Sequence, residues 1–78
     1  MDYKEFINKN INVYVSSRSN LTFKYHGTLE SVGANNIILA NASMGILMPS
    51  GFGSLEQKVD SNIEKIAINR DFIVSCSA

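Results

Sequence analysis

Apolar and polar residues alternate in two runs between residues 11 and 30. The first run reads INVYVS over residues 11–16, and the second extends from Leu21 to Glu30. Because successive side chains of a strand point to opposite faces, a period of two predicts strands with one buried face. Gly27 lies inside the second run, where a glycine indicates a strong bend or a close approach by another strand.

A short α-helix is predicted ahead of these strands. Asp2 and Glu5 have the spacing of a capping box, in which the aspartate accepts an amide hydrogen bond at the helix start. Three apolar side chains then fall on one helical face, namely Tyr3, Phe6 and Ile7. The polar residues 8–10 end this helix after two turns, so it has to pack its apolar side on the strands.

Three further strands are predicted in the rest of the chain. Residues 37–40 read IILA and are apolar on both faces, which is typical of a strand covered on each side. Residues 59–68 return to a strand pattern, with a change of parity between Ile63 and Ile66 that indicates a bulge or kink. Residues 72–76 are rich in β-branched and aromatic residues. Together the pattern predicts a mainly β chain: one short N-terminal α-helix and five strongly bent antiparallel strands that form a small β-barrel.

The length of the chain favours one domain that associates with copies of itself. A chain of 78 residues has room for a single domain over residues 1–78. Such a domain buries only about 60% of its unfolded surface, and one cysteine cannot form an internal disulfide. The last strand, Phe72 to Cys76, is expected at a sheet edge, where pairing with a neighbour in closed symmetry would build a homo-oligomeric ring.

The segment from Ser43 to Lys58 has no clear period. It combines glycines, the only proline and several large apolar side chains. An apolar loop of that length is unusual in a free monomer. We expect a protruding hairpin that packs on its own side chains or on a neighbour, with a loop that grips a ligand as the alternative.

Charge and composition argue against several functions. Seven Lys and Arg residues balance seven Asp and Glu residues, so a polyanion would need a localised basic patch. The only histidine, His26, is expected on a polar strand face, and Cys76 is expected as a strand side chain without a catalytic partner. We therefore expect no metal site, no cofactor and no enzymatic activity.

The sequence also predicts no association with membranes. Its apolar runs are shorter than the roughly 18 residues that span a bilayer. The first five residues, MDYKE, are too charged for a secretory signal. We expect a cytoplasmic protein.

Two motifs resemble those of the Sm-like (LSm) family. Residues 27–42 read GTLESVGANNIILANA, in which the family positions are occupied by Gly27, Leu29, Asn36 and Leu39. Residues 68–74 read INRDFIV and resemble the second motif, with Arg70 as its arginine. This resemblance implies a short helix on a five-stranded bent barrel that assembles into rings.

The resemblance also implies an RNA site. In the family, the loop asparagine hydrogen-bonds a base edge and the arginine of the second motif flanks the same base around the pore of the ring. Carried over to this chain, the site is Asn36 and Arg70, with Asn35 and Asn69 beside them. An amide offers both a donor and an acceptor, and arginine adds a planar cation. The implied function is non-enzymatic binding of short, single-stranded, uridine- or adenine-rich RNA.

The motifs leave an alternative open. Gly33 stands where the family has its loop aspartate, and Asp71 follows Arg70 where the family has a glycine. Asparagine is also common in tight turns for conformational reasons alone. The alternative function is a ring-shaped structural or protein-interaction scaffold, such as one of phage or mobile-element origin, that binds no RNA and works through the apolar Met44 to Phe52 loop.

Overall fold

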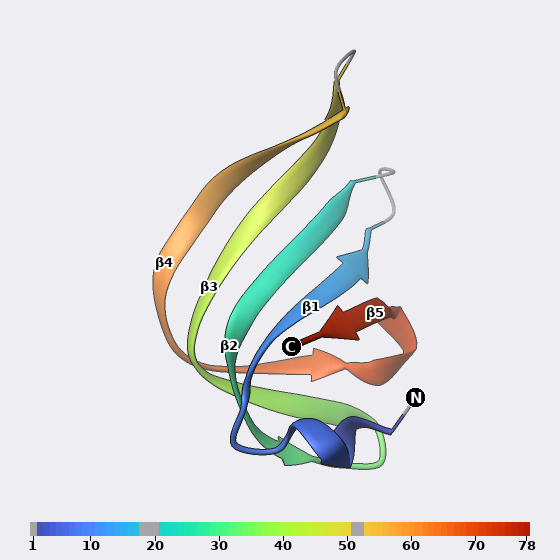
Figure 1. The fold of residues 1–78 in the computed structure, drawn as a ribbon, viewed down its shortest axis with the longest axis vertical. Coiled ribbons are helices and arrows are strands. Elements are labelled where there is room, and N and C mark those ends of the chain that lie inside the picture. The colour runs from blue at the N-terminus through green and yellow to red at the C-terminus, as the bar shows by residue number, and fades with distance from the viewer. Residues whose placement is uncertain (1, 18–20, 51–52) are drawn as a thin grey trace.

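The computed structural model describes residues 2–17, 21–50 and 53–78. Five antiparallel strands form one sheet in the order β4-β3-β2-β1-β5, so β4 and β5 are its two edges (Figure 1). The predicted mainly β, five-stranded antiparallel fold is confirmed, whereas the sheet is open rather than closed. The elements are the 3-10 helix η1 (Tyr3–Phe6), β1 (Asn10–Ser16), β2 (Thr22–Val32), β3 (Asn36–Ser50), β4 (Gly53–Asn69), the 3-10 helix η2 (Arg70–Phe72) and β5 (Ile73–Ser77).

A close crossing of β2 and β3 bends the sheet at Gly27. A Cβ atom on Gly27 would lie 2.9 Å from the Ala40 carbonyl oxygen and 3.0 Å from Ala42 Cα. The register of the two strands shifts at this point, so that Asn41 and Ala42 both face Gly27, which is the arrangement of a β-bulge. Asn41 has a φ of 50°, a left-handed conformation that asparagine tolerates better than most residues. The close approach expected at Gly27 is confirmed.

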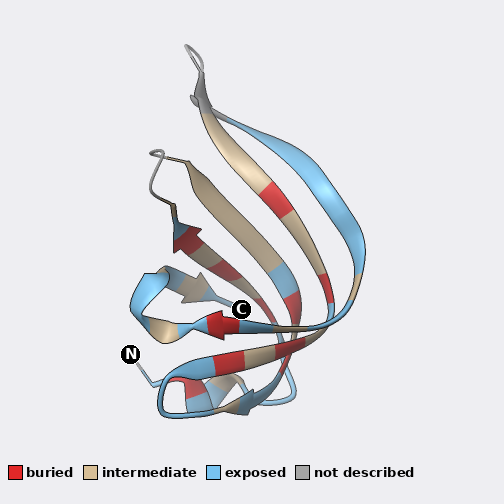
Figure 2. Cartoon of the chain, turned by 180° about the vertical axis from the view of Figure 1, so that it is seen from behind, coloured by how far each residue is buried: buried red, intermediate tan, exposed pale blue. Residues whose placement is uncertain are grey.

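The bent strands enclose one hydrophobic core. Figure 2 shows the buried positions gathered where the strands curve over one another, while the arm of β4 toward the β3–β4 tip is exposed. The alternating residues of β1 point inward, as their period predicted. The buried residues are Tyr3, Ile11, Val13, Val15, Leu29, Ile37, Leu39, Ala42 and Ile68.

The N-terminal helix is a 3-10 helix and not the predicted two-turn α-helix. Asp2 caps it as expected, because its Oδ1 accepts a hydrogen bond from the Lys4 amide at 3.0 Å. The Ile7 amide then donates to the Lys4 carbonyl, and Asn8 turns the chain away with a φ of 68°. With only four residues, the tighter i→i+3 pattern is the one that fits. Ile7 therefore leaves the apolar face and is 37% exposed.

The 43–58 segment is a paired hairpin and not a loop. β3 continues to Ser50, and β4 begins at Gly53, with Ser50 and Gly53 as the last partners of the ladder. Gly51 and Phe52 lie outside the described residues. Register shifts near Met44 break the period of two that a regular strand shows, which explains why the sequence pattern hides these strands. The expected hairpin is confirmed, and the strand predicted at 59–68 begins earlier.

The part of the chain that the structure describes contains no helix with the length and hydropathy needed to cross a membrane.

The crossing at Gly27 predicts a steric cost for any side chain there. Gly27→Ala places a methyl group against the backbone of β3, which cannot move aside without opening the bulge. We expect it to lower the free energy of unfolding by about 1–3 kcal/mol, measured by urea denaturation. The matched control is Gly33→Ala, whose Cβ would meet one atom at 3.3 Å. Equal stability of Gly27→Ala and the wild type would contradict the proposed role of the crossing.

Candidate functional site

The four residues predicted for RNA binding lie together at one end of the sheet. Asn36 and Asn69 are direct partners in the β3–β4 ladder. The Arg70 amide donates a 2.8 Å hydrogen bond to the Asn35 carbonyl. The β2–β3 turn is thereby joined to the start of η2, although the two are more than thirty residues apart in the sequence. We call Asn35, Asn36, Asn69 and Arg70 the turn surface.

The Arg70 side chain connects three segments of the chain. Its Nη1 donates a 2.8 Å hydrogen bond to the Gly33 carbonyl in the β2–β3 turn. Its guanidinium carbon lies 4.9 Å from the centre of the Tyr3 ring, within the range of a cation–π contact. Tyr3 is the first residue of η1 and is itself buried, so the arginine has a contact on η1 as well as on the β2–β3 turn. The orientation of its planar cation is therefore fixed by the fold.

Some asparagines of the turn surface have structural roles in the turns, which they form through hydrogen bonds. The Gly33 amide donates to the Asn36 carbonyl at 2.7 Å, which closes the β2–β3 turn through the backbone. The Asn69 Oδ1 accepts from the Asp71 amide at 2.9 Å and caps η2. Asn69 thus has a clear structural role. Asn35 and Asn36 contribute backbone groups to the turns, and both residues are exposed.

The turn surface can recognise a planar, hydrogen-bonding ligand. Two exposed amides each provide a donor and an acceptor, and Arg70 adds a positive charge with several N–H donors. Asp71, also exposed, follows Arg70 in the sequence. Tyr3 is the contributor that sequence reasoning missed, because its contact depends on η1 lying beside η2. Its only signal in the sequence was an aromatic residue on the apolar helix face.

His26 and Cys76 are the only histidine and the only cysteine of the sequence. His26 is exposed on β2, and its Nδ1 lies 2.8 Å from the Asn12 Oδ1. Burial raises the pKa of the Cys76 thiol on β5, which disfavours the thiolate that a nucleophile needs.

Both edges of the sheet expose large apolar side chains. On β4, Leu55 is 61% exposed and Val59 is 55% exposed; toward the other edge, Phe72 in η2 is 57% exposed and Val74 on β5 is 62% exposed. Edge strands also present unpaired backbone groups. Apolar side chains on such strands mark surfaces suited to association with another chain.

No protein-family model matches this chain, and no curated protein matches it in sequence.

The contact between Tyr3 and Arg70 predicts a measurable coupling. Replacing Tyr3 by Leu removes the ring that faces the guanidinium, whereas Tyr3→Phe keeps it. In a double-mutant cycle with Arg70→Gln, we expect Tyr3→Leu to show a coupling of about 1 kcal/mol in the free energy of unfolding. A cycle with Arg70→Gln and Tyr3→Phe should give much less. Additive effects of Tyr3→Leu and Arg70→Gln would refute the contact.

Proposed function

We propose that this chain is an Sm-like protein whose copies form a ring and bind short single-stranded RNA through the turn surface. The observation that carries the proposal is that Asn36 and Arg70, which come from two separate motifs, lie in adjoining turns. The five-stranded antiparallel sheet and the short N-terminal 3-10 helix support the proposal at the level of strand number and element order, and the closed barrel remains part of the proposal. The proposal includes no catalytic step.

The chemistry of the turn surface suits a nucleobase better than a bare phosphate. The Asn35 and Asn36 amides can pair with the donor and acceptor pattern of a base edge. The fixed guanidinium of Arg70 can stack on a base or contact the adjacent phosphate. Uridine-rich or adenine-rich strands are the proposed ligands, because their unpaired bases are free to enter such a site.

The two open edges of the sheet support the ring. If β5 of one copy pairs with β4 of the next, the backbone groups of both edges are satisfied and the exposed Leu55 and Val74 side chains are covered. This contact joins different surfaces of the two copies, so it generates a ring when the rotation closes. As in the family that the chain resembles, the turn surfaces would then surround a common pore.

The RNA site is tested most cleanly through its exposed amides, because Arg70 also has structural contacts. Asn35→Ala combined with Asn36→Ala should weaken binding of a short uridine-rich or adenine-rich oligonucleotide about tenfold, since it removes one or two net hydrogen bonds. Fluorescence anisotropy measures this change, with Asn62→Ala, an exposed asparagine on β4, as the matched control. Unchanged affinity in the double variant would remove the site assignment.

The ring is tested by adding a charge to an edge. Val74→Lys places an ammonium group where the neighbouring copy would pack, at a position exposed within one chain. We expect it to convert the oligomer to monomers without loss of folding, as measured by native mass spectrometry and circular dichroism. Ser31→Lys adds the same charge to an exposed position of the interior strand β2 and should leave the oligomer intact. A wild-type protein that is monomeric would exclude the ring.

A second candidate function, a scaffold without RNA, is favoured by the exposed β3–β4 hairpin. Leu55 and Val59 lie on its β4 arm with more than half of each side chain exposed. Under this alternative the hairpin contacts a protein partner. An intact ring that binds neither uridine-rich nor adenine-rich RNA would favour it.

A further inference from the structure

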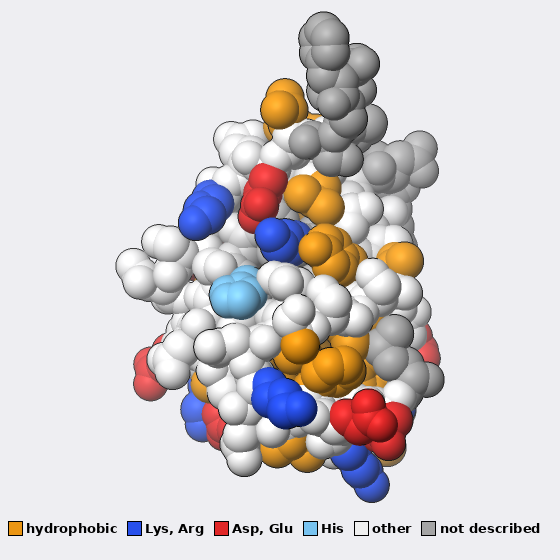
Figure 3. Space-filling model, viewed as in Figure 1, with side chains coloured by type: hydrophobic (Ala, Val, Ile, Leu, Met, Phe, Trp, Pro, Cys, Tyr) orange, Lys and Arg blue, Asp and Glu red, His pale blue; other side chains and the backbone are white. Residues whose placement is uncertain are grey.

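A polar hollow lies on the sheet face opposite the core. It has a volume of about 330 Å³ and is formed by side chains from four strands. Asn12 alternates with the buried Ile11 and Val13, which places it on the outer face. Figure 3 shows the histidine on this face, with basic and acidic side chains above it. The lining residues are Asn12, Lys24, His26, Ser43, Glu56 and Lys58.

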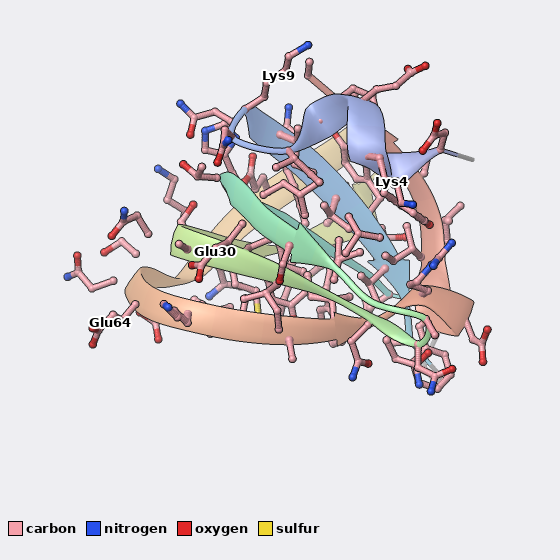
Figure 4. All side chains as sticks on the ribbon, turned by 90° about the horizontal axis from the view of Figure 1, so that it is seen from below. Lys4, Lys9, Glu30 and Glu64 are labelled. Carbon is pink, nitrogen blue, oxygen red and sulfur yellow. The ribbon has the colours of Figure 1, made fainter. Side chains whose placement is uncertain are left out.

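The hollow collects hydrogen-bond donors and positive charge. Lys24 and Lys58 oppose a single carboxylate, Glu56, so the lining carries a net positive charge on a chain whose net charge is zero. Other charged side chains are dispersed: Lys9 lies on the side of the N-terminal segment and Glu64 on the side of β4 (Figure 4). The lining of the hollow therefore has one net positive charge, which favours an anionic ligand over a cationic one.

The ion pair inside the hollow is weak enough to be exchanged. The Lys24 Nζ lies 3.4 Å from the Glu56 Oε2, and both side chains are partly exposed. Exposed pairs of this kind contribute little to stability. Within the described residues, Lys58 forms no ion pair. Both ammonium groups can thus turn to an anionic ligand.

His26 and Asn12 line the hollow together with the two lysines. If the Asn12 Oδ1 accepts the 2.8 Å contact, the His26 Nδ1 carries the hydrogen, and the Nε2 of the neutral ring is then an acceptor. The neutral donor of this pair toward a phosphate oxygen is therefore the Asn12 amide group. The Ser43 hydroxyl adds a donor from β3, the strand beside β2. Phosphate oxygens accept several hydrogen bonds at once and favour ammonium partners.

We infer that this hollow binds a phosphate group, held by Lys24 and Lys58 with the neutral donors around them. The phosphate belongs either to free inorganic phosphate or to the backbone of the RNA strand. The second source rests on the proposed function, whereas the first does not. The Glu56 carboxylate competes with the phosphate for the Lys24 ammonium group. Removing this carboxylate should therefore strengthen phosphate binding.

The test compares three charge variants of the full chain. Chemical shifts of the lining residues are followed by NMR during titration with inorganic phosphate, and anisotropy is followed with the uridine-rich oligonucleotide. We expect Lys58→Gln to weaken binding about three- to fivefold and Glu56→Gln to strengthen it by a similar factor. Lys65→Gln makes the same charge change as Lys58→Gln outside the hollow, where Lys65 is paired with Glu30, and should have little effect.

The pattern of variants identifies the source of the phosphate. A response of the hollow to inorganic phosphate supports a site for the free ion, and a response to the oligonucleotide alone supports the RNA backbone. Equal effects of Lys58→Gln and Lys65→Gln, or none with either ligand, would overturn the inference. If RNA affinity depends on Asn35 and Asn36 but not on Lys58, the hollow does not contact the RNA. If RNA affinity depends on Lys58 but not on Asn35 and Asn36, the turn surface is not the RNA site.

Discussion

The crossing of β2 over β3 at Gly27 is the constraint on which the rest of the molecule depends. The absent side chain lets the backbone of β3 pass within contact distance, and the Asn41–Ala42 bulge turns the strand there. Leu29, two residues later, exchanges hydrogen bonds with Asn8 and Lys9 and so anchors the segment after η1. Tyr3 lies in η1, just before this segment, and its ring contacts the Arg70 guanidinium. The bend therefore determines both where the core closes and where the turn surface is held.

The two faces of the sheet carry different chemistry as a direct result of strand alternation. On β1 and β2, every inward residue contributes to the core or packs against it, while the outward residues Asn12, Lys24 and His26 line the polar hollow. Neighbouring strands then bring polar side chains from β3 and β4 to the same place. A chain whose net charge is zero can thus have a local site with net positive charge, because the fold brings Lys24 and Lys58 together on one face.

The sequence predicted the parts of the fold that follow from local pattern. Alternation placed β1 and β2, Gly27 marked the bend, and the glycine and asparagine residues marked the β2–β3 turn. The hairpin at 43–58 was expected, but the extent of its paired strands was not, because bulges near Met44 interrupt the period. η1 was predicted as an α-helix because the i, i+3, i+4 spacing does not reveal helix length. The stacking of Arg70 on Tyr3 and the hollow could not be predicted, since both join residues from distant segments and depend on register.

Photo-crosslinking of RNA to the full chain tests the central claim most directly. A short oligonucleotide containing 4-thiouridine would be irradiated with the protein, and the crosslinked peptides identified by mass spectrometry. Binding at the turn surface predicts crosslinks in the segments that contain Asn35 to Asn36 and Asn69 to Arg70. Crosslinks confined to the β3–β4 hairpin, or no crosslinks with RNA present in excess, would contradict RNA recognition by these turns.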